Sequence, residues 1–574
     1  MPPSSSRRRS CRFLQPHLPD ECWESIFKYL TNPHDLESLS LVSRHFLSIT
    51  NRIRTHLTIS DGVIPLLPAL LRRFPNLTSI KLTRYFTGDI DALLSQISSF
   101  DLPTLHSLDI SDQYPFPSHG LRQFSQKFPT LKSLNCSSMP LDFLIAECFP
   151  NLEEIHVTFT SVYWETDLQV KALTSGLKKL RKVDLSGTWI LEDSSIFTLC
   201  QNCVFLEALV VHETDSLSNI GIANAIRERP QLRSLDLTAC VTLELIDALV
   251  SLKDLTCLDL SCSDISDEAL CALADGVLPL RELSLGYTGI WIPYLLRKCN
   301  NLQYLDLQRT EFLTDECVID LSLLLGNLNA VKLSRNAELT DLSLFTIMRN
   351  CPLITKIWME RTSVGKHKLE ENCLVVNSHL KFLYLAWNPW LEDASVAMLA
   401  SVCPNLEMMD LSNCGRVSKG AIEVLWRCCK IQHMNLAELG YELSHFQFRV
   451  NFEVPTLFML NLSRLSISDE ELSLISKSCY NLKELKLDYC RKITASGVNQ
   501  VVRNCKQLRM VSLYYCEKLS CDIIPWMVLT RPSLREIITP QFSRDTVRKR
   551  DHFLRYGCHV DLLPEDRNRM LRWK

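Results

Sequence analysis

The sequence predicts an α/β fold, a right-handed solenoid curved like a horseshoe, with a concave parallel sheet and helices on the convex side. Two observations predict it. The motif Leu-x-x-Leu-x-Leu, or a close variant, returns about 19 times at a step of about 26 residues. The step is also regular, which means that each unit buries its apolar face only against its neighbours. The leading residues of successive units show this regularity: Leu302, Leu328, Ile354, Leu380, Leu406, Ile431, Leu457, Leu482, Leu508 and Leu534.

Composition bounds the classes of function. The 574 residues are 46% hydrophobic and 22% charged, and the formal net charge is -3, so no global charge draws the chain to nucleic acid or to a membrane. The longest apolar stretch, residues 63–71, is interrupted by Pro65 and Pro68, whereas a membrane span needs about 20 residues. The 24 cysteines without an export signal indicate reduced thiols, and we therefore expect a protein of the nucleus, the cytoplasm or both.

The region before the repeats has a different pattern. Residues 1–16 are rich in Ser, Pro and Arg and predict a disordered leader. Residues 17–57 predict a helical segment, in which Pro19 suits a first helical turn and Asp20 and Glu21 complement the helix dipole. This segment is too short and too apolar to bury all its side chains alone. Some of them must therefore face a partner or the solenoid.

The solenoid is expected over residues 58–540, as strand, turn and helix in each unit. Ser468-x-x-Glu471 predicts a capping box, and Thr314 and Thr340 are further helix start signals. Residues 444–452 are an exception, because they alternate like a strand where a helix is due. Residues 541–574 are net basic and should cap the last unit, since terminal repeats need a polar outer face.

The cysteines keep the phase of the repeat. We expect both sets to fill small buried gaps, although Cys200-x-x-Cys203 could also be half of a zinc site. No second pair has suitable spacing, so the sequence predicts no metal. One set should close the helices and the other should follow the strands: Cys203, Cys299, Cys351, Cys403, Cys429, Cys479 and Cys505, then Cys136, Cys240, Cys414, Cys490 and Cys516.

The N-terminal helical segment resembles an F-box. The residues that carry the resemblance are 18–30 (LPDECWESIFKYL), Asp35-Leu36 and 41–46 (LVSRHF), with Phe46 where the family commonly has Trp. The units that follow resemble the cysteine-containing leucine-rich repeats of plant-type F-box proteins. The resemblance implies an adaptor-binding face made of these residues: Leu18, Pro19, Ile26, Phe27, Leu30, Leu36, Leu41 and Val42.

The function implied by this resemblance is that of the substrate-recognition subunit of an SCF-type E3 ubiquitin ligase. The F-box would bind a Skp-type adaptor and, through it, the cullin scaffold, while the concave face would hold a target protein for ubiquitination and proteasomal degradation. Such a chain is a receptor and not an enzyme, and the sequence shows no catalytic motif. The alternatives are an interaction scaffold without a role in ubiquitin transfer, or a co-receptor for a small ligand such as a hormone or an inositol phosphate.

The target site is predicted on the concave face between Tyr304 and Trp387. Side chains alternate along a strand, so Tyr304, Trp358, Phe382 and Tyr384 should face outward, where clustered aromatics are typical of binding hot spots. Beside them the repeat aligns Arg309, Arg335, Arg361 and Trp387. Stacked arginines suit a carboxylate or a phosphate.

Two weaker hypotheses concern charges on the same face. The three arginines could instead be neutralised by Glu311, Glu338 and Glu360. The aspartates between the second and third leucines, which include Asp306 and Asp410, should be solvated surface residues. We expect no cofactor, although an inositol phosphate on the arginines stays open. Units separated by no more than about 28 residues lack long loops, which favours direct protein recognition.

Overall fold

The computed structural model describes most of the chain, in two compact units, residues 1–157 and 158–574. The described residues are 18–30, 36, 39–83, 86, 88–139, 143–158, 166–188, 191–212, 214, 216–238, 243–289, 293–310, 313–367, 375–439, 452–540 and 549–561. The predicted leader, Cys240, Glu311, residues 444–451 and most of the predicted basic cap lie outside these ranges. None of the described helices is long and apolar enough to cross a membrane.

The first unit joins two N-terminal helices to a parallel sheet. The helices α1 (Asp20–Lys28) and α3 (Arg44–Ile53) come first, and the strands pair in chain order from β1 to β5. The strands are β1 (His56–Ile59), β2 (Ser79–Leu82), β3 (Ser107–Asp109), β4 (Ser133–Asn135) and β5 (Glu154–His156). Between them lie a 3-10 helix η1 (Asp61–Leu66) and helices α4 (Leu67–Arg73), α5 (Ile90–Ser98), α6 (Ser118–Lys127) and α7 (Leu144–Cys148).

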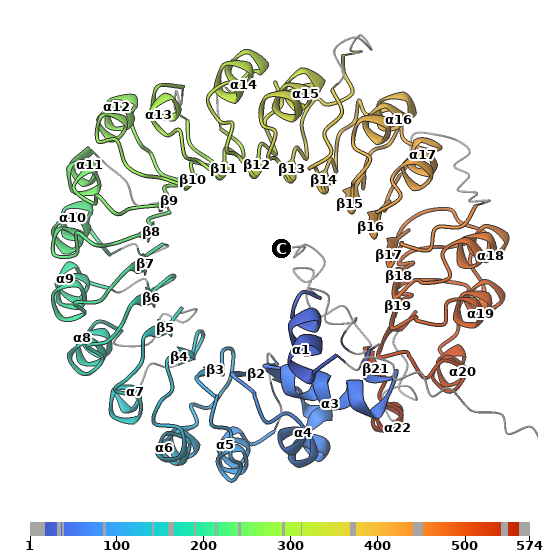
Figure 1. The fold of residues 1–574 in the computed structure, drawn as a ribbon, viewed down its shortest axis with the longest axis horizontal. Helices are drawn as coiled ribbons and strands as arrows, with labels where there is room; N and C mark the ends of the chain where they lie inside the picture. The colour runs from blue at the N-terminus through green and yellow to red at the C-terminus, as the bar shows by residue number, and fades with distance from the viewer. Residues whose placement is uncertain are drawn as a thin grey trace, which may run out of the picture. The chain divides into compact units, whose positions relative to one another are not determined.

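The second unit contains the regular repeats. Its strands pair in parallel with the next in chain order, from β6 to β21, and lie along the inner side of the unit (Figure 1). The strands are β6 (Lys182–Asp184), β7 (Ala208–Val210), β8 (Ser234–Asp236), β9 (Cys257–Asp259), β10 (Glu282–Ser284), β11 (Tyr304–Asp306), β12 (Ala330–Lys332), β13 (Lys356–Trp358), β14 (Phe382–Tyr384), β15 (Met408–Asp410), β16 (His433–Asn435), β17 (Met459–Asn461), β18 (Glu484–Lys486), β19 (Met510–Ser512), β20 (Glu536–Ile538) and β21 (His559–Asp561).

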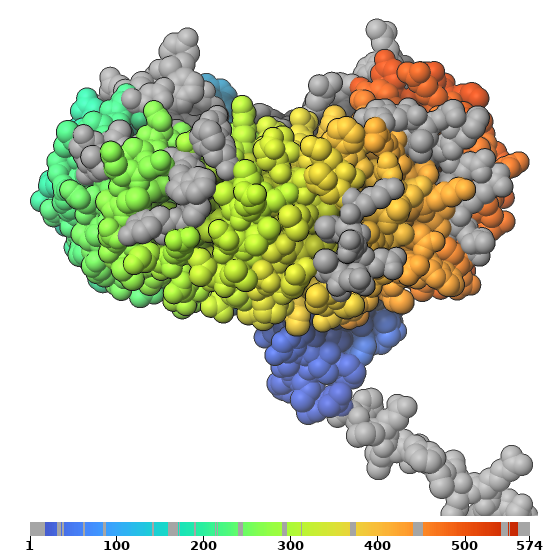
Figure 2. Space-filling model, turned by 90° about the horizontal axis from the view of Figure 1, so that it is seen from above, coloured from blue at the N-terminus to red at the C-terminus, as the bar shows by residue number. Residues whose placement is uncertain are grey.

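Helices cover the outer side of this sheet. Figure 2 shows the outer surface of this unit, on which the segments coloured from green to orange follow one another in chain order. The helices are α8 (Thr166–Gly176), α9 (Asp193–Asn202), α10 (Asn219–Arg227), α11 (Leu243–Val250), α12 (Asp267–Asp275), α13 (Pro293–Lys298), α14 (Asp315–Ser322), α15 (Asp341–Asn350), α16 (Asp393–Val402), α17 (Gly420–Arg427), α18 (Asp469–Ser478), α19 (Ala495–Asn504), α20 (Ile523–Thr530) and α22 (Arg550–Arg555). The leucines of the motif lie fully buried between the two layers, for example Leu302, Leu305 and Leu307.

The repeats extend further than predicted at both ends. Strand β1 begins at His56, inside the segment predicted as F-box, and β21 ends at Asp561, inside the predicted cap. The strands therefore number more than the predicted 19 or so. Neither terminal strand carries the full leucine motif, which explains why the motif alone did not locate them.

Aspartates at the helix starts connect consecutive repeats. Asp393, the first residue of α16, accepts hydrogen bonds from the Ser418 amide at 2.6 Å and from the Gly420 amide at 2.7 Å, both in the next repeat. Burial alone would raise the pKa of Asp393, but these hydrogen bonds outweigh it and lower the pKa. Asp315 and Asp469 make equivalent bonds to the amides of Thr340 and Thr494, at 2.9 and 2.8 Å. The predicted capping box of Ser468 and Glu471 is also present.

The cysteines occupy buried positions in the predicted phase, with one correction. Cys203, Cys351, Cys403, Cys479 and Cys505 are the C-cap residues of their helices. In α17, however, the C-cap is the buried Cys428, whereas the predicted Cys429 is exposed. The unit that begins at Leu406 is one residue short, with 25 residues up to Ile431, so the helix ends one residue earlier. No grouping of residues able to hold a metal is found in the described part of the chain.

The cysteines that follow the strands occupy the repeat position that asparagine occupies in other repeats. Asn388 donates hydrogen bonds to the carbonyls of Met359 in the previous repeat and of Leu385, at 2.8 and 2.9 Å. One repeat later, the Cys414 thiol donates to the Leu385 carbonyl at 3.2 Å. Burial raises the pKa of Cys414 to about 12, so the thiol stays protonated and able to donate. These cysteines therefore connect repeats as well as fill gaps.

A turn of left-handed backbone follows most strands. From Tyr287 onward the same phase of each repeat has a positive φ, between 50° and 65°, in Tyr287, Arg309, Arg335, Arg361, Trp387, Asn413, Glu438, Arg464, Tyr489 and Tyr515. Each of these amides donates a hydrogen bond to a carbonyl of the next repeat, as the Arg335 amide does to Glu360 at 2.7 Å. We call this row of residues the turn column. The turn column includes the aligned residues Arg309, Arg335, Arg361 and Trp387 predicted from the sequence.

Candidate functional site

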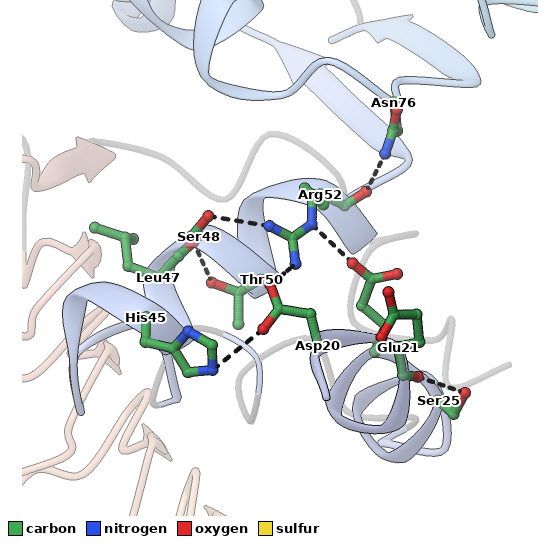
Figure 3. A network of polar contacts seen from close by, with 10 residues as sticks. Asp20, Glu21, Ser25, His45, Leu47, Ser48, Thr50, Arg52 and Asn76 are labelled. Carbon is green, nitrogen blue, oxygen red and sulfur yellow. Dashed lines mark hydrogen bonds and ion pairs between the residues drawn. The ribbon is translucent and has the colours of Figure 1, made fainter. Parts of the chain in front are cut away.

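The two N-terminal helices are held together by ion pairs. Arg52 on α3 contacts Glu24 on α1 through Nε at 2.7 Å, and Asp20 through its terminal nitrogen, also at 2.7 Å (Figure 3). His45 lies 3.5 Å from the other carboxylate oxygen of Asp20. Ser43 caps α3 by accepting a hydrogen bond from the Phe46 amide at 3.0 Å. These contacts fix the angle between α1 and α3.

Aromatic packing makes the core of this helix pair. The Phe27 ring packs against Trp23 and Phe46, with ring centroids 5.8 and 5.1 Å apart, and only 2% of Phe27 is exposed. Phe27 was predicted to contact the adaptor, and the structure places it in the core instead. Its neighbour Ile26 points the other way and is 46% exposed. Phe46, which stands where the F-box family commonly has Trp, packs its ring against Trp23 and Phe27 in this core.

Much of the predicted adaptor face is exposed and apolar. Leu18, Pro19, Ile26, Leu41 and Val42 are all exposed, and Leu41 reaches 87%. Leu30 and Leu36 are half-buried. Tyr29 is also highly exposed and belongs to the same helix face, three residues after Ile26, a spacing that could have identified it in the sequence. Several exposed large apolar side chains within one short segment are typical of a protein interaction surface.

The concave sheet carries a row of charged and aromatic side chains in register. Asp306, Lys332, Trp358, Tyr384 and Asp410 are direct partners on the neighbouring strands β11 to β15. The Trp358 and Tyr384 rings stack, with centroids 5.0 Å apart and planes 7° apart. We call these five residues the central row. The predicted aromatics thus do come together.

A lysine that the sequence analysis missed lies in the central row, between Asp306 and Trp358. The Lys332 ammonium group is 3.3 Å from Asp306 and lies over both the Tyr304 ring, at 5.6 Å, and the Trp358 ring, at 5.8 Å. The predicted Phe382 lies one residue before Leu383 on β14, half-buried beneath the Lys356 ammonium at 5.1 Å. The alternation rule predicts both lysines as outward-facing, so a search for charges as well as aromatics would have found them.

The predicted arginines form an exposed cationic edge beside this row. Arg309 and Arg335 lie over the Tyr287 ring, at 5.6 and 6.0 Å, and Arg361 lies over the Trp387 ring at 4.5 Å. Among the described residues, none of these three guanidinium groups has an ion-pair partner within 4.0 Å, and neither Glu338 nor Glu360 fills that role. These three arginine side chains of the turn column are therefore free to meet an anion.

Two acids on the concave face are less solvated than predicted. Asp410 is 7% exposed, although it was expected to be a solvated surface residue, and burial raises its pKa. Burial also raises the pKa of Glu360 to about 7, and the negative charge of Asp410 adds to the effect. The Ser334 hydrogen bond and the charges of Arg335 and Arg361 lower it again. The concave face therefore combines a cationic edge with a buried acidic centre.

Comparisons with known proteins agree with this architecture. Residues 15–59 match the F-box-like family, and residues 251–274 and 376–400 match the family described as Leucine Rich repeat. The chain thus carries an F-box-like segment followed by leucine-rich repeats, the class that the sequence resemblance predicted.

Particular relatives have the same combination in their names. The chain is similar to F-box/LRR-repeat protein 4 of Bos taurus, with 24% identity over 173 residues, 29% of this chain and 28% of that protein. It is also similar to Coronatine-insensitive protein homolog 2 of Oryza sativa subsp. japonica, with 26% identity over 252 residues, 42% of this chain and 40% of that protein. The matched segments therefore span less than half the length of these relatives.

The chain also has distant matches among solved structures. Similarity is found to the mouse RP105/MD-1 complex, with a TM-score of 0.46 and 17% identity over 85% of this chain and 80% of that one. The yeast Rad7 and Elc1 complex gives a TM-score of 0.34 and 15% identity, over 87% of this chain and 93% of that one. The fold described above rests on the strands and helices themselves.

Proposed function

We propose that this chain is the substrate-recognition subunit of an SCF-type E3 ubiquitin ligase, acting in the nucleus or the cytoplasm. Its F-box binds a Skp-type adaptor and thereby the cullin scaffold, and its concave sheet binds a target protein for ubiquitination and degradation. The chain contributes no covalent chemistry. It acts by proximity, because holding the target beside the ubiquitin donor raises the effective concentration of the target lysines.

The exposed apolar face of the F-box-like segment carries this proposal. Ile26, Leu41 and Val42 expose large apolar side chains from a segment in which Asp20, Glu24 and Arg52 are already paired with one another. Burying such a face against a partner is favourable, at about 25 cal/mol per Å² of apolar surface. A surface of this kind fits a partner that is bound permanently and not a transient ligand.

The first experiment tests the adaptor face. A Skp-type adaptor is co-expressed with the full chain, with the Ile26→Asp variant and with the double variant Leu18→Ala, Pro19→Ala. We expect both variants to lose the adaptor on co-purification, while the circular dichroism of the repeats is unchanged. Ile220→Asp is the control, an isoleucine on α10 outside the F-box that is 61% exposed against 46% for Ile26. Retention of the adaptor by both F-box variants would favour the alternative of a scaffold without a role in ubiquitin transfer.

The second experiment tests the concave face. Proteins captured by the full chain, with and without proteasome inhibition, are compared with those captured by Arg335→Glu and by Trp358→Ala. We expect both variants to lose the captured target and to stabilise it in cells, because one removes a free cation and the other the aromatic stack. Arg503→Glu on the outer helix α19 is the control. If both variants capture the target like wild type, the site lies elsewhere on the repeats.

A small anionic ligand on the turn column is a second candidate. The observation that favours it is the absence of an ion-pair partner for Arg309, Arg335 and Arg361 among the described residues. Arginine clusters bind phosphate through paired N–H donors. Calorimetric titration with inositol hexakisphosphate, and with inorganic phosphate for comparison, tests this directly. Binding that Arg335→Glu abolishes would establish a co-receptor, whereas no binding would leave direct recognition of the target protein.

A further inference from the structure

The loop between β14 and α16 exposes two tryptophans to solvent. Trp387 is 47% exposed and Trp390 is 41% exposed, and only two residues separate them in the sequence. Tryptophan has a large apolar surface that is mostly buried in folded proteins. Two exposed tryptophans in one short loop are therefore typical of a protein contact site and not of an inert surface. We call residues 387–390 the tryptophan loop.

An arginine from each neighbouring repeat lies against one of these two rings. The Arg361 guanidinium, from the preceding repeat, is 4.5 Å from the centre of the Trp387 ring. The Arg416 guanidinium, from the following repeat, is 5.0 Å from the centre of the Trp390 ring. Such contacts are favourable and restrict both side chains. The surface thus combines tryptophan and arginine, two of the residue types most enriched in binding hot spots.

The backbone of the tryptophan loop is fixed from the interior of the repeat. Asn388 is fully buried and donates hydrogen bonds to the carbonyls of Met359 and Leu385, at 2.8 and 2.9 Å. It also accepts a hydrogen bond from the Thr362 amide at 2.9 Å. Because the centre of the loop is already ordered, little conformational entropy is lost when a partner binds to it.

The preceding repeat packs against the same loop through a glycine. Gly365 has a φ of 96°, and a Cβ atom there would overlap the backbone of Trp390 and Leu391. The Gly365 amide donates a hydrogen bond to Asp341 at 2.8 Å, which keeps the glycine in this position. Only glycine permits so close an approach of two backbones. The loop therefore has a rigid support on the side of the preceding repeat.

The charge around the tryptophan loop is mostly positive. In the described part of the strand-to-helix loops after β12 to β15, the exposed charged residues are Arg335, Arg361, Lys366 and Lys419 against Glu338 and Glu392. Glu392 lies 3.8 Å from Arg416 and so already has a cation beside it. Arg335 and Arg361 have no ion-pair partner within 4.0 Å in that part of the chain. An acidic partner complements this surface.

We infer that the target binds to the tryptophan loop and the adjacent arginines through an acidic segment that carries a large apolar side chain. The apolar side chain rests on Trp387 and Trp390, and the carboxylates meet Arg335 and Arg361. A guanidinium group binds a carboxylate through two parallel N–H donors. The inference rests on the proposed function, in which the repeats hold a target, and it names the edge and the chemistry of that contact.

The two tryptophans favour a protein segment over a small anion as the occupant. A phosphate or an inositol phosphate would neutralise the arginines but would leave the exposed parts of both indole rings in water. A peptide with an apolar side chain beside its carboxylates covers the rings and pairs the cations in one contact. Exposed apolar and cationic groups on the same loops therefore point to a partner that has both matching groups.

The test uses the full chain and a random library of displayed 12-residue peptides. After selection on wild type, one enriched peptide is synthesised as selected, with asparagine and glutamine in place of its acids, and with alanine in place of its largest apolar residue. We expect acidic residues to be enriched together with an apolar one. Each altered peptide should bind wild type at least about tenfold more weakly, as measured by fluorescence anisotropy.

Variants of the chain assign these preferences to the tryptophan loop. Trp390→Ala should weaken binding of the selected peptide at least about tenfold and should no longer distinguish it from the alanine form, whereas Trp390→Phe should keep most of the difference. The double variant Arg335→Glu, Arg361→Glu should prefer a peptide with lysines in place of the acids, which a folding defect could not produce. Trp426→Ala is the control, a tryptophan on α17 that is 63% exposed, and should bind like wild type.

The inference is overturned if selection enriches no acidic residue, or if Trp387→Ala and Trp390→Ala bind the selected peptide like wild type. Binding of inositol hexakisphosphate without binding of any acidic peptide would overturn it as well. Adaptor binding and target capture are measured with the same variants. Target capture that is lost in Trp358→Ala but kept in the tryptophan-loop variants would count against this inference alone. Peptide recognition by a chain that binds no adaptor would count against the proposed ligase role alone.

Discussion

The F-box-like helices and the concave sheet expose opposite kinds of side chain. In the helices, the charges of Asp20, Glu24 and Arg52 are paired, and several large apolar side chains are exposed. On the sheet, the apolar residues are buried, while three arginines and two acids have no counter-charge among the described residues. An apolar face gives affinity with little selectivity, whereas uncompensated charges penalise every partner that does not match them. One chain therefore carries a surface suited to a constant partner and another suited to choosing among partners.

The two regions also differ in what fixes their side chains. The F-box-like segment depends on a few contacts, such as the Phe27 cluster and Arg52. The sheet is fixed by bonds repeated in each unit, such as those of Asn388 and of the turn column. Single substitutions should therefore have large local effects in the helices and graded effects in the repeats.

The largest effect should come from neighbouring residues of the first helix. Phe27→Ala removes the buried centre of the aromatic cluster and should cost about 3–5 kcal/mol. Ile26→Ala truncates an exposed side chain and should change stability by less than about 0.5 kcal/mol. Amide hydrogen exchange in α1 and α3 measures both. Equal protection in the two variants would mean that Phe27 is not the core of this segment.

A similar pair in the repeats should show a smaller difference. Asn388→Ala leaves the carbonyls of Met359 and Leu385 without their donor and should cost about 3 kcal/mol. Trp387→Ala changes an exposed residue and should affect binding but not unfolding. Asn388→Cys should fall in between, because Cys414 occupies the same phase one repeat later. Urea unfolding of the three variants checks the order, which fails if Cys is no better than Ala.

Glu360 should make the stability of the repeats depend on pH. Its pKa is raised from 4.5 to about 7, so the folded state holds a proton that the unfolded state has lost in that range. Stability should therefore fall as pH rises from 4.5 to 7, by about 2 kcal/mol after allowance for partial exposure. Glu360→Gln should remove this fall and be the more stable protein at pH 8. A wild type and variant with parallel pH profiles would contradict the assignment.

The smallest effect should be at the cysteines. In Cys505→Ser, the shorter C–O bond leaves the new hydroxyl too far from the carbonyls of Ser476 and Cys479, which the thiol reaches at 3.7 Å, for a normal hydrogen bond. The cost should be about 1 kcal/mol, the low end for a small buried polar group without a good partner. A zinc chelator or a reductant should not change the melting temperature of the wild type. A clear fall on chelation would reveal a metal site.

The sequence predicted the fold well because the information is periodic. The leucine motif placed nearly every strand, and the phase of the cysteines was wrong only at Cys429, where one unit is a residue short. The terminal strands β1 and β21 escaped because they lack the full motif. Period alone locates a repeat but not the ends of the array.

The site was less predictable because burial on a concave surface depends on neighbours from other strands. Asp410 was predicted to be solvated because it points outward from its own strand. In the structure, neighbouring side chains cover it, and it is only 7% exposed. Phe27 was assigned to the adaptor face by resemblance, although its packing on Trp23 and Phe46 needs the angle between two helices. The arginines were located by phase, but their left-handed backbone was not visible in the sequence.

That left-handed backbone has a consequence for engineering. A non-glycine residue with φ near 60° costs about 1 kcal/mol, and glycine adopts the same conformation without strain. Glycine at Arg309, Arg335, Arg361 and Trp387 should therefore remove the recognition groups while relaxing the turns that carry them. The product would be a neutral, stable carrier, on which new side chains could be installed at one position per strand, about 4.8 Å apart.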